Sequence, residues 1–257
     1  MNAGSFLTAV TELARLAGEV AQSHYRSGLS VEQKADGSPV TIADRAAELA
    51  AREWIMTHFP QDGILGEEFG ETNPGARRRW LLDPIDGTKS FVRGVPLWGT
   101  LVAVTEGDEV LAGAAAFPPV GELVAAARGE GCWWNGSRCR VSSVSTLAEA
   151  TVLTTDDRLL ERPESRERWR TLVDRAGVSR TWGDCFGYLL VATGRAEVMT
   201  DPVLHAWDAV VLEPIITEAG GVLTDWTGKH TPFGGGVIAT NAALDREVRD
   251  ILVDPGT

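Results

Sequence analysis

The chain has 257 residues and a formal net charge of −12, from 36 acidic and 24 basic side chains. Apolar residues make up 44% and charged residues 23%, an ordinary globular balance that excludes disordered, collagen-like and coiled-coil chains. The acidic balance also argues against a nucleic-acid binder, because binding to a phosphate backbone requires a basic surface. The length allows one large domain or two half-size lobes.

The first half of the chain predicts two helices against a largely antiparallel sheet. Apolar residues recur at helical spacing over 5–26 and over 43–58, so each range is expected to form a helix. Short extended or strand segments, several of them separated by glycine-containing turns, are expected at 29–34, 64–65, 80–82, 97–105, 109–117 and 121–127.

The second half alternates between strands and helices, which is typical of an α/β lobe. The expected strands are 151–154, 178–182, 196–199, 221–225 and 236–240. The expected helices are 164–175, 185–193, 206–219 and 242–253. We therefore expect an α+β N-terminal lobe over residues 1–145 and an α/β C-terminal lobe over residues 146–257.

The cysteines and the N-terminus favour a cytoplasmic protein. The chain has three cysteines and no CxxC spacing, so a disulfide framework or a structural zinc site is not expected. The N-terminal segment lacks the basic flank and long apolar run of a signal peptide. No apolar stretch is long enough to span a bilayer, so no membrane partner is expected.

Carboxylates gather in three short segments at predicted strand and helix ends. These are Gly66-Glu67-Glu68, Asp83-Pro84-Ile85-Asp86-Gly87-Thr88 and Trp207-Asp208. A turn at Pro84 would direct the Asp83 and Asp86 carboxylates and the Ile85 carbonyl to one side. Such hard oxygen ligands suit Mg²⁺, Mn²⁺ or Ca²⁺. Each acid alone has an ordinary reading as a turn or helix-cap residue.

Convergence of these acids would require cations. Two carboxylates 4 Å apart repel by about 4 kcal/mol at an effective dielectric constant near 20. A fold that collected four of them therefore needs positive charge from outside the chain. Two metal ions would provide it, and a two-metal site suits phosphoryl hydrolysis.

Taken in order, these segments and the downstream Glu218-Ala219-Gly220-Gly221 resemble the inositol monophosphatase family of Mg²⁺-dependent, lithium-sensitive phosphatases. The resemblance covers nearly the whole chain, from the Lys34 and Asp44 region to Gly221. It implies a layered α/β/α/β/α sandwich, two or three Mg²⁺ ions per active site and a homodimer. The expected substrate class is a small-molecule phosphate ester.

The resemblance also assigns roles by position. Metal ligands would be Glu67, Asp83, the Ile85 carbonyl, Asp86 and Asp208, with Asp83 bridging two ions and Glu67 also reaching a third. Asp44 would accept a hydrogen bond from the Thr88 hydroxyl, and this catalytic pair would work with Glu67 to orient the attacking water. The backbone amides of Gly87 and Thr88 would hold the phosphate. Glu68 and Lys34 would contact the metal ligands and not the metal ions.

Two further carboxylates indicate the alcohol of the substrate. Asp184 stands where inositol phosphatases have a small residue, and Asp201 stands where they have a glutamate that contacts inositol. Two acids in the alcohol pocket suggest a cationic leaving group. Together with the segment Phe91–Trp98, they resemble the histidinol-phosphatase branch, so L-histidinol phosphate is the predicted substrate, with Arg93 as a third substrate contact.

Each of these three residues has another interpretation. Asp184 would serve equally as the N-cap of the helix expected at 185–193, and Asp201 as a turn residue before Pro202. Arg93 would form a surface ion pair, or contact substrate from a neighbouring subunit.

Other functions fit the sequence less well. An inositol-1-phosphate or broad sugar-phosphate phosphatase is the main alternative, because the metal motifs do not select the alcohol. A bisphosphate nucleotidase lacks the basic cluster that a second phosphate requires. A thiol hydrolase built on Cys185, in the G-x-C-x-G pattern of residues 183–187, leaves the carboxylates unexplained. A protein-binding regulatory member of the family would not need the intact ligand set.

Overall fold

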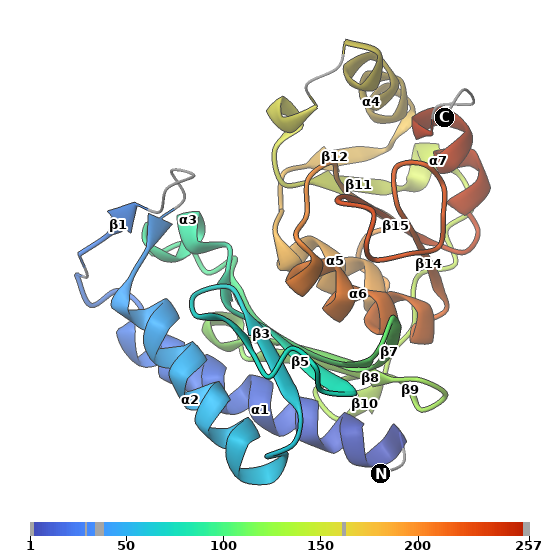
Figure 1. Ribbon diagram of the computed structural model, residues 1–257. Coiled ribbons are helices and arrows are strands. Elements are labelled where there is room, and N and C mark those ends of the chain that lie inside the picture. The colour runs from blue at the N-terminus through green and yellow to red at the C-terminus, as the bar shows by residue number, and fades with distance from the viewer. Residues whose placement is uncertain (1–2, 29, 34–38, 161–162, 254–257) are drawn as a thin grey trace.

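The computed structural model describes residues 3–28, 30–33, 39–160 and 163–253, arranged in five layers. Helices cover the outer face of an eight-stranded sheet, two more helices lie between that sheet and a five-stranded sheet, and a last pair covers the far side (Figure 1). The expected α/β/α/β/α sandwich is therefore confirmed. Among the described residues, none of the helices combines the length and apolar character needed to cross a bilayer.

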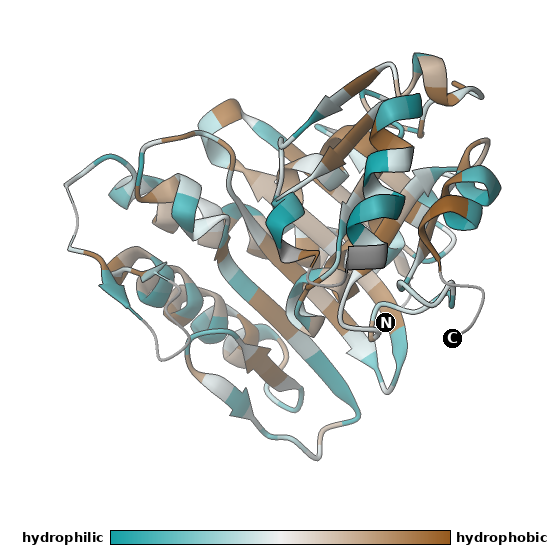
Figure 2. Cartoon of the chain, turned by 90° about the horizontal axis from the view of Figure 1, so that it is seen from above, coloured by the Kyte–Doolittle hydropathy of each residue, from teal (hydrophilic) through white to brown (hydrophobic). Residues whose placement is uncertain are grey.

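The first layer consists of α1 (Ala3–His24) and α2 (Ile42–His58), which pack against the larger sheet. Helix α1 buries one stripe, which includes Phe6, Val10 and Leu13, and exposes its other side. A helix that contacts protein on one face only requires this amphipathic pattern. Figure 2 accordingly shows both hydrophilic and hydrophobic bands along the outer helices.

The larger sheet has the strand order β10-β9-β8-β7-β6-β5-β3-β4. Its neighbouring strands are antiparallel except for β3 and β5, which are parallel, so the prediction of a largely antiparallel sheet is confirmed. The strands are β3 (Gly63–Gly66), β4 (Gly70–Thr72), β5 (Arg78–Asp86), β6 (Gly99–Glu106), β7 (Glu109–Phe117), β8 (Glu122–Ala127), β9 (Gly131–Trp134) and β10 (Ser137–Arg138). A separate two-stranded ribbon consists of β1 (Glu32–Gln33) and β2 (Pro39–Val40).

The smaller sheet has the order β12-β11-β13-β15-β14 and mixes parallel with antiparallel pairs. Its strands are β11 (Thr151–Thr154), β12 (Val178–Arg180), β13 (Val198–Asp201), β14 (Gly221–Thr224) and β15 (Val237–Asn241). The helices outside it are α4 (Pro163–Arg175) and α7 (Asp245–Leu252). Short 3₁₀ segments occur at Pro118–Val120, Leu147–Glu149 and Asp157–Leu159.

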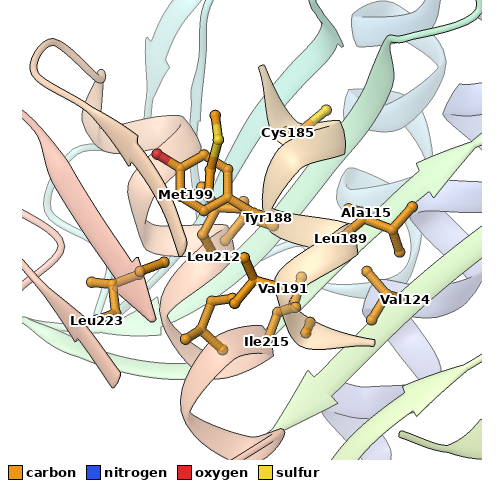
Figure 3. Packing of buried hydrophobic residues seen from close by; sticks show 14 of the residues in the cluster. Ala115, Val124, Cys185, Tyr188, Leu189, Val191, Met199, Leu212, Ile215 and Leu223 are labelled. Atoms are coloured by element: carbon orange, nitrogen blue, oxygen red, sulfur yellow. The ribbon is translucent and has the colours of Figure 1, made fainter. Parts of the chain in front are cut away.

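The central layer contains α5 (Cys185–Ala192) and α6 (Ala206–Glu218), and both are apolar on nearly every side. Their side chains contribute to one buried cluster that also includes residues from both sheets. In Figure 3, Leu189 of α5 and Ile215 of α6 lie between residues of the larger sheet, such as Val124, and residues of the smaller sheet, such as Leu223. A helix between two sheets has no solvent face, so its sequence loses the amphipathic period.

Some of the shortest elements were not anticipated by the sequence. Strands β4, β9 and β10 and the four-residue helix α3 (Thr88–Phe91) are two to four residues long. Elements of that length contain too few residues to show a period of 2 or 3.6. The three cysteines are free thiols, and the sulfur atoms of Cys132 and Cys139 lie 3.4 Å apart.

Replacing Gly113 by alanine is expected to cost about 1–3 kcal/mol of unfolding free energy. A Cβ added to Gly113 in β7 would lie 2.5 Å from the backbone oxygen of Val211, so α6 would have to move away from the sheet. Denaturant unfolding measures the change. The control is Gly75→Ala, where the added Cβ meets no atom within 4 Å. Equal stability of the two variants would contradict this close packing of α6.

Candidate active site

A β-bulge in β5 directs two aspartates to the same site. Asp83 pairs with Leu101 of β6 and Asp86 pairs with Gly99, so three steps along β5 match two steps along β6. In a regular strand, residues three apart point to opposite faces, and the extra residue of a bulge restores them to one side. Pro84 fits the bulge because proline has no backbone N–H to donate to the neighbouring strand. The expected turn is thus a bulge within a strand.

The bulge and helix α6 together form an acidic cluster. Asp83, Asp86 and Asp208 each offer an oxygen atom, and these atoms all lie within 4.8 Å of one another. Asp208 is in the first turn of α6, where the helix dipole favours a negative charge. Its Oδ1 atom is buried and has no hydrogen-bond partner in the part of the chain that is described. This oxygen-rich donor set with one unsatisfied atom fits a hard metal cation.

The electrostatics of the cluster show why a cation is needed. Burial raises the pKa of Asp83 and of Asp208 well above the ordinary aspartate value, and the neighbouring carboxylates raise both further. The pKa of Asp86 rises to about 6, also mainly through burial. Burial and mutual repulsion therefore disfavour the charged form of these carboxyl groups, and a bound cation would offset both effects.

Glu67 lies beside this cluster, at the end of β3. Its backbone N–H donates to the Leu82 carbonyl at 3.1 Å, and its charge contributes to the raised pKa of Asp83. Glu67 lines the same cavity as the three aspartates. Glu68 does not belong to the cavity lining, and Lys34 is outside the described residues.

The hydrogen bonds of Asp44 and Thr88 differ from the expected pairing. Asp44 accepts from the Thr41 backbone N–H at 2.8 Å and from the Thr41 hydroxyl at 2.7 Å, within the capping box at the start of α2. The Thr88 hydroxyl donates to the Ile85 carbonyl at 3.0 Å. A hydroxyl has one proton to donate, so Thr88 does not donate to Asp44 in this structure. Burial raises the pKa of Asp44.

Gly87 and Thr88 form a tight entry into helix α3. Gly87 has φ +87°, and an added Cβ would lie 2.9 Å from the Leu97 carbonyl oxygen. Both the backbone conformation and the lack of space therefore disfavour a side chain at this position. The first N–H groups of a helix have no carbonyl within the helix to bond. The amides that follow Gly87 therefore offer donors to an anion in the cavity.

Asp184 occupies the N-cap position of α5 but does not cap the helix with its side chain. Its backbone has φ 51° and ψ −157°, a region that non-glycine residues adopt at a cost of about 1–3 kcal/mol. A Cβ placed on Gly87 would lie 3.1 Å from Asp184 Oδ2, so the carboxylate approaches the amide loop. Burial, followed by repulsion from Asp86, raises the pKa of Asp184 to about 7.

Asp201 is the last residue of β13 and is buried. One carboxylate oxygen accepts from the Thr155 N–H at 3.0 Å, and the other accepts from the Tyr188 hydroxyl at 3.0 Å. It pairs with Val237 of β15, so it is a strand residue and not a turn residue. Burial raises its pKa to about 7.

Arg93 lies apart from the other candidate residues. Its side chain is exposed and donates to the Lys89 carbonyl at 3.1 Å. Arg93 is not among the residues that line the cavity.

Most of the candidate residues line a cavity of about 250 Å³, but Asp44, Glu68 and Arg93 do not. The lining also contains side chains that were not among the predicted site residues: Lys89, Thr155, Val203, His205 and Trp207. His205 and Trp207 stack with ring centroids 4.7 Å apart at 19°. Lys89 directly follows Thr88, and His205 and Trp207 both come shortly before Asp208. Proximity to the motifs was therefore an available signal.

A larger hollow of about 510 Å³ lies elsewhere, between α6 and the β6–β7 turn. Its lining includes Arg128, Glu213 and Glu218 and none of the expected metal ligands. Size alone therefore does not identify the site, and the carboxylate cluster does.

Cys185 is unsuited to act as a nucleophile. Its side chain is buried, and burial together with the nearby Asp86 raises the thiol pKa well above its ordinary value. The thiolate is the nucleophilic form, so the environment suppresses it. The thiol-hydrolase alternative is therefore wrong on physical grounds.

The metal-free protein is expected to be more stable at about pH 6 than at about pH 8. The folded-state pKa values of Asp184 and Asp201, about 7, lie above the ordinary aspartate value. Stabilisation from these protons is fully present below the unfolded pKa and is lost as pH rises through about 7. Asp156, whose pKa is lowered to about 2 by Arg158, titrates below this window.

Thermal unfolding in EDTA and in Mg²⁺ at both pH values measures this effect. Mg²⁺ should raise the melting temperature more at the higher pH, because there the carboxylates have lost the protons that a cation replaces. A metal-free melting temperature that increased with pH over this range would contradict the raised pKa values.

Comparison with known proteins gives consistent matches over nearly the full length. A model of the inositol monophosphatase family matches residues 3–253. The chain is 42% identical over 239 residues to a histidinol-phosphatase from Chlorobaculum parvum, with 92% of each chain covered. It is 40% identical over 225 residues to a histidinol-phosphatase from Mycobacterium tuberculosis, with 86% of each covered. The solved extragenic suppressor protein suhB from Bartonella henselae superposes with a TM-score of 0.91 at 27% identity, covering 98% of this chain and 99% of that one.

Proposed function

Since this chain belongs to the inositol monophosphatase family, we propose that it is a Mg²⁺-dependent phosphomonoesterase that hydrolyses L-histidinol phosphate to L-histidinol and phosphate. The single observation that carries the choice of substrate is the placement of Asp184, whose carboxylate lies beside the Gly87 amide loop. The two histidinol-phosphatases at 40% and 42% identity support the same choice.

A cationic leaving group explains a carboxylate at this position. Histidinol carries an ammonium group and an imidazole, and inositol carries neither. A buried carboxylate of the protein binds a cationic ligand much more tightly than a neutral analogue, because the neutral ligand leaves the carboxylate charge unpaired. Asp201 lines the same cavity, and each of its oxygens accepts one hydrogen bond, from Thr155 or Tyr188, which leaves acceptor capacity for a substrate ammonium group. The stacked His205 and Trp207 rings offer a flat surface for an imidazole.

The acidic cluster would hold two or three Mg²⁺ ions. The proposed ligands are the carboxylates and one carbonyl that converge on the cavity: Glu67, Asp83, Ile85, Asp86 and Asp208. When bound, the ions neutralise the carboxylates, polarise the phosphate and lower the pKa of water.

The chain itself would position the other reactants. The amides of Gly87 and Thr88 would donate to the phosphate oxygens, and the Thr88 hydroxyl is among the groups that line the cavity. We assign Thr88, Asp44 and Glu67 to the orientation of the attacking water. The Thr88 hydroxyl would need to turn from the Ile85 carbonyl to Asp44, whose bonds from Thr41 both end on Oδ2. In-line attack from water breaks the ester P–O bond without a covalent phosphoenzyme.

We also propose a homodimer, because the family resemblance implies one. In a dimer, Arg93 would be free to reach the substrate of the neighbouring subunit, since its side chain is exposed. Sedimentation equilibrium tests the assembly, and a monomer at micromolar concentration would rule it out.

The experiment that tests the function is phosphate release in Mg²⁺ from histidinol phosphate and inositol 1-phosphate, with EDTA as control. We expect kcat/KM to favour histidinol phosphate by more than about 100-fold, with no release in EDTA. Equal rates, or a preference for inositol 1-phosphate, would overturn the substrate and leave the metal site intact. Cleavage of neither ester would overturn the phosphatase assignment.

A further inference from the structure

Glu48 in the middle of α2 is a buried carboxylate with no place in the mechanism above. Its side chain has 0% relative exposure. One oxygen accepts from the Glu68 backbone N–H at 2.7 Å, and the other accepts from the Phe69 N–H at 3.2 Å. Both donors belong to the loop that follows Glu67. A carboxylate that accepts backbone N–H groups makes charge-assisted bonds, which are stronger than neutral ones.

Arg52, one turn further along α2, completes the arrangement. Its Nε donates to Glu48 at 2.7 Å, and its side chain has 9% relative exposure. The same guanidinium donates to the Thr72 hydroxyl at 2.9 Å and to the Gly70 carbonyl. The ion pair therefore forms hydrogen bonds with the turn and with β4 of the β3–β4 hairpin.

Gly66 shows how closely the loop is held. A Cβ added there would lie 2.0 Å from Glu48 Oε1, so the backbone next to Glu67 rests directly on the carboxylate. Asp44, Glu48 and Arg52 are spaced four residues apart and share one face of α2. This face thus runs from the proposed catalytic Asp44 to the hairpin that carries Glu67.

We propose that Glu48 and Arg52 are positioning residues that fix Glu67 against the Asp83, Asp86 and Asp208 cluster for metal binding. Glu67 lies in the short loop between β3 and β4, and movement of this loop would change the distance from its carboxylate to the three aspartates. The buried ion pair opposes that movement by holding the loop backbone. Rigid placement of a ligand lowers the ordering cost that metal binding must overcome. This inference rests on the proposed metal site, but not on the identity of the alcohol.

The test is Mn²⁺ binding by calorimetry without substrate, in the wild type and in Glu48→Gln. Glutamine keeps the size of the side chain and one acceptor oxygen, but its NH₂ group would face a donor and Arg52 would lose its counter-ion. We expect Mn²⁺ affinity to fall by about 10–100-fold, as is usual when a group that orients a metal ligand is lost. The matched control is Glu53→Gln, an exposed glutamate on the same helix, which should bind like the wild type.

A double-mutant cycle separates positioning from general destabilisation. If Glu48 acts through Glu67, then adding Glu48→Gln to a Glu67→Gln protein should cause little further loss of Mn²⁺ affinity. Additive losses, or unchanged affinity in the folded Glu48→Gln protein, would overturn the proposal. If Glu48→Gln does not fold, Thr72→Val is the second variant, because it removes one acceptor of Arg52 near the surface. We expect it to weaken Mn²⁺ binding by a smaller factor. Wild-type Mn²⁺ affinity in Thr72→Val would overturn the proposal.

The outcome is distinguishable from failure of the proposed function. Normal Mn²⁺ binding by the wild type, with weakened binding by Glu48→Gln, supports the inference even if histidinol phosphate is not cleaved. Cleavage of histidinol phosphate with equal Mn²⁺ affinity in both proteins overturns the inference alone. A wild-type protein that binds no Mn²⁺ overturns both.

Discussion

Replacement of Asp86 by asparagine is expected to lower kcat/KM for histidinol phosphate on the order of 10³-fold. Asparagine keeps the shape of the side chain and removes a negative charge from the centre of the cluster. Asp86 Oδ2 accepts from the backbone N–H of Cys185, so this carboxylate also joins the bulge of β5 to the start of α5. Asparagine can preserve that bond through its carbonyl, and the loss should therefore fall on metal binding.

Phosphate release measured over a range of Mg²⁺ concentrations checks this expectation. The variant should need much more Mg²⁺ for half-maximal activity, if activity is recovered at all. Asp108→Asn is the matched control, because Asp108 is exposed in the β6–β7 turn and lies outside the site cavity. An Asp86→Asn protein with near-normal rates at low Mg²⁺ would show that the cluster does not bind the catalytic cation.

Replacement of Asp184 by asparagine is expected to raise KM for histidinol phosphate by about 10–100-fold and to change KM for inositol 1-phosphate little. The carboxylate is nearly enclosed between Gly87 and α5, where a charge pair with an ammonium group is weakly screened. Asparagine tolerates the positive φ of this position better than alanine does, so the backbone should keep its conformation.

The measurement is a pair of steady-state KM values for each ester in the wild type and the variant. Asp157→Asn is the control, since Asp157 is exposed and outside the site cavity. A similar rise in KM for both esters would assign Asp184 to loop structure. No rise for either would remove it from substrate recognition altogether.

Several features of this protein were determined by its sequence alone. The longer helices and strands were predicted within a few residues, because each buries one face or lies between two sheets and so shows a clear pattern. The acidic motifs indicated a metal site, because Glu67, Asp83, Asp86 and Asp208 have no ordinary structural reason to occur in that combination. The family and the layered fold followed from the order of the same motifs.

Only the tertiary structure decided how these residues are used. Asp83 and Asp86 share a side because of a register shift with β6, a partner strand that local sequence does not identify. Asp201 was expected to face the substrate; it lines the cavity, and its oxygens also accept hydrogen bonds from Thr155 and Tyr188, which are distant in sequence. Asp44 bonds to Thr41, and Arg93 lies at the surface.

The roles of Glu48 and Arg52 also depend on the tertiary structure. On the sequence they form an ordinary i, i+4 pair of a solvated helix face, a pattern that carries no functional signal. In the fold they are buried against a hairpin about twenty residues later in the chain. Residue type and spacing determine which chemistry is available to the protein. Hydrogen bonds and burial depend on which distant segments meet, so long-range packing decides which side chain performs that chemistry.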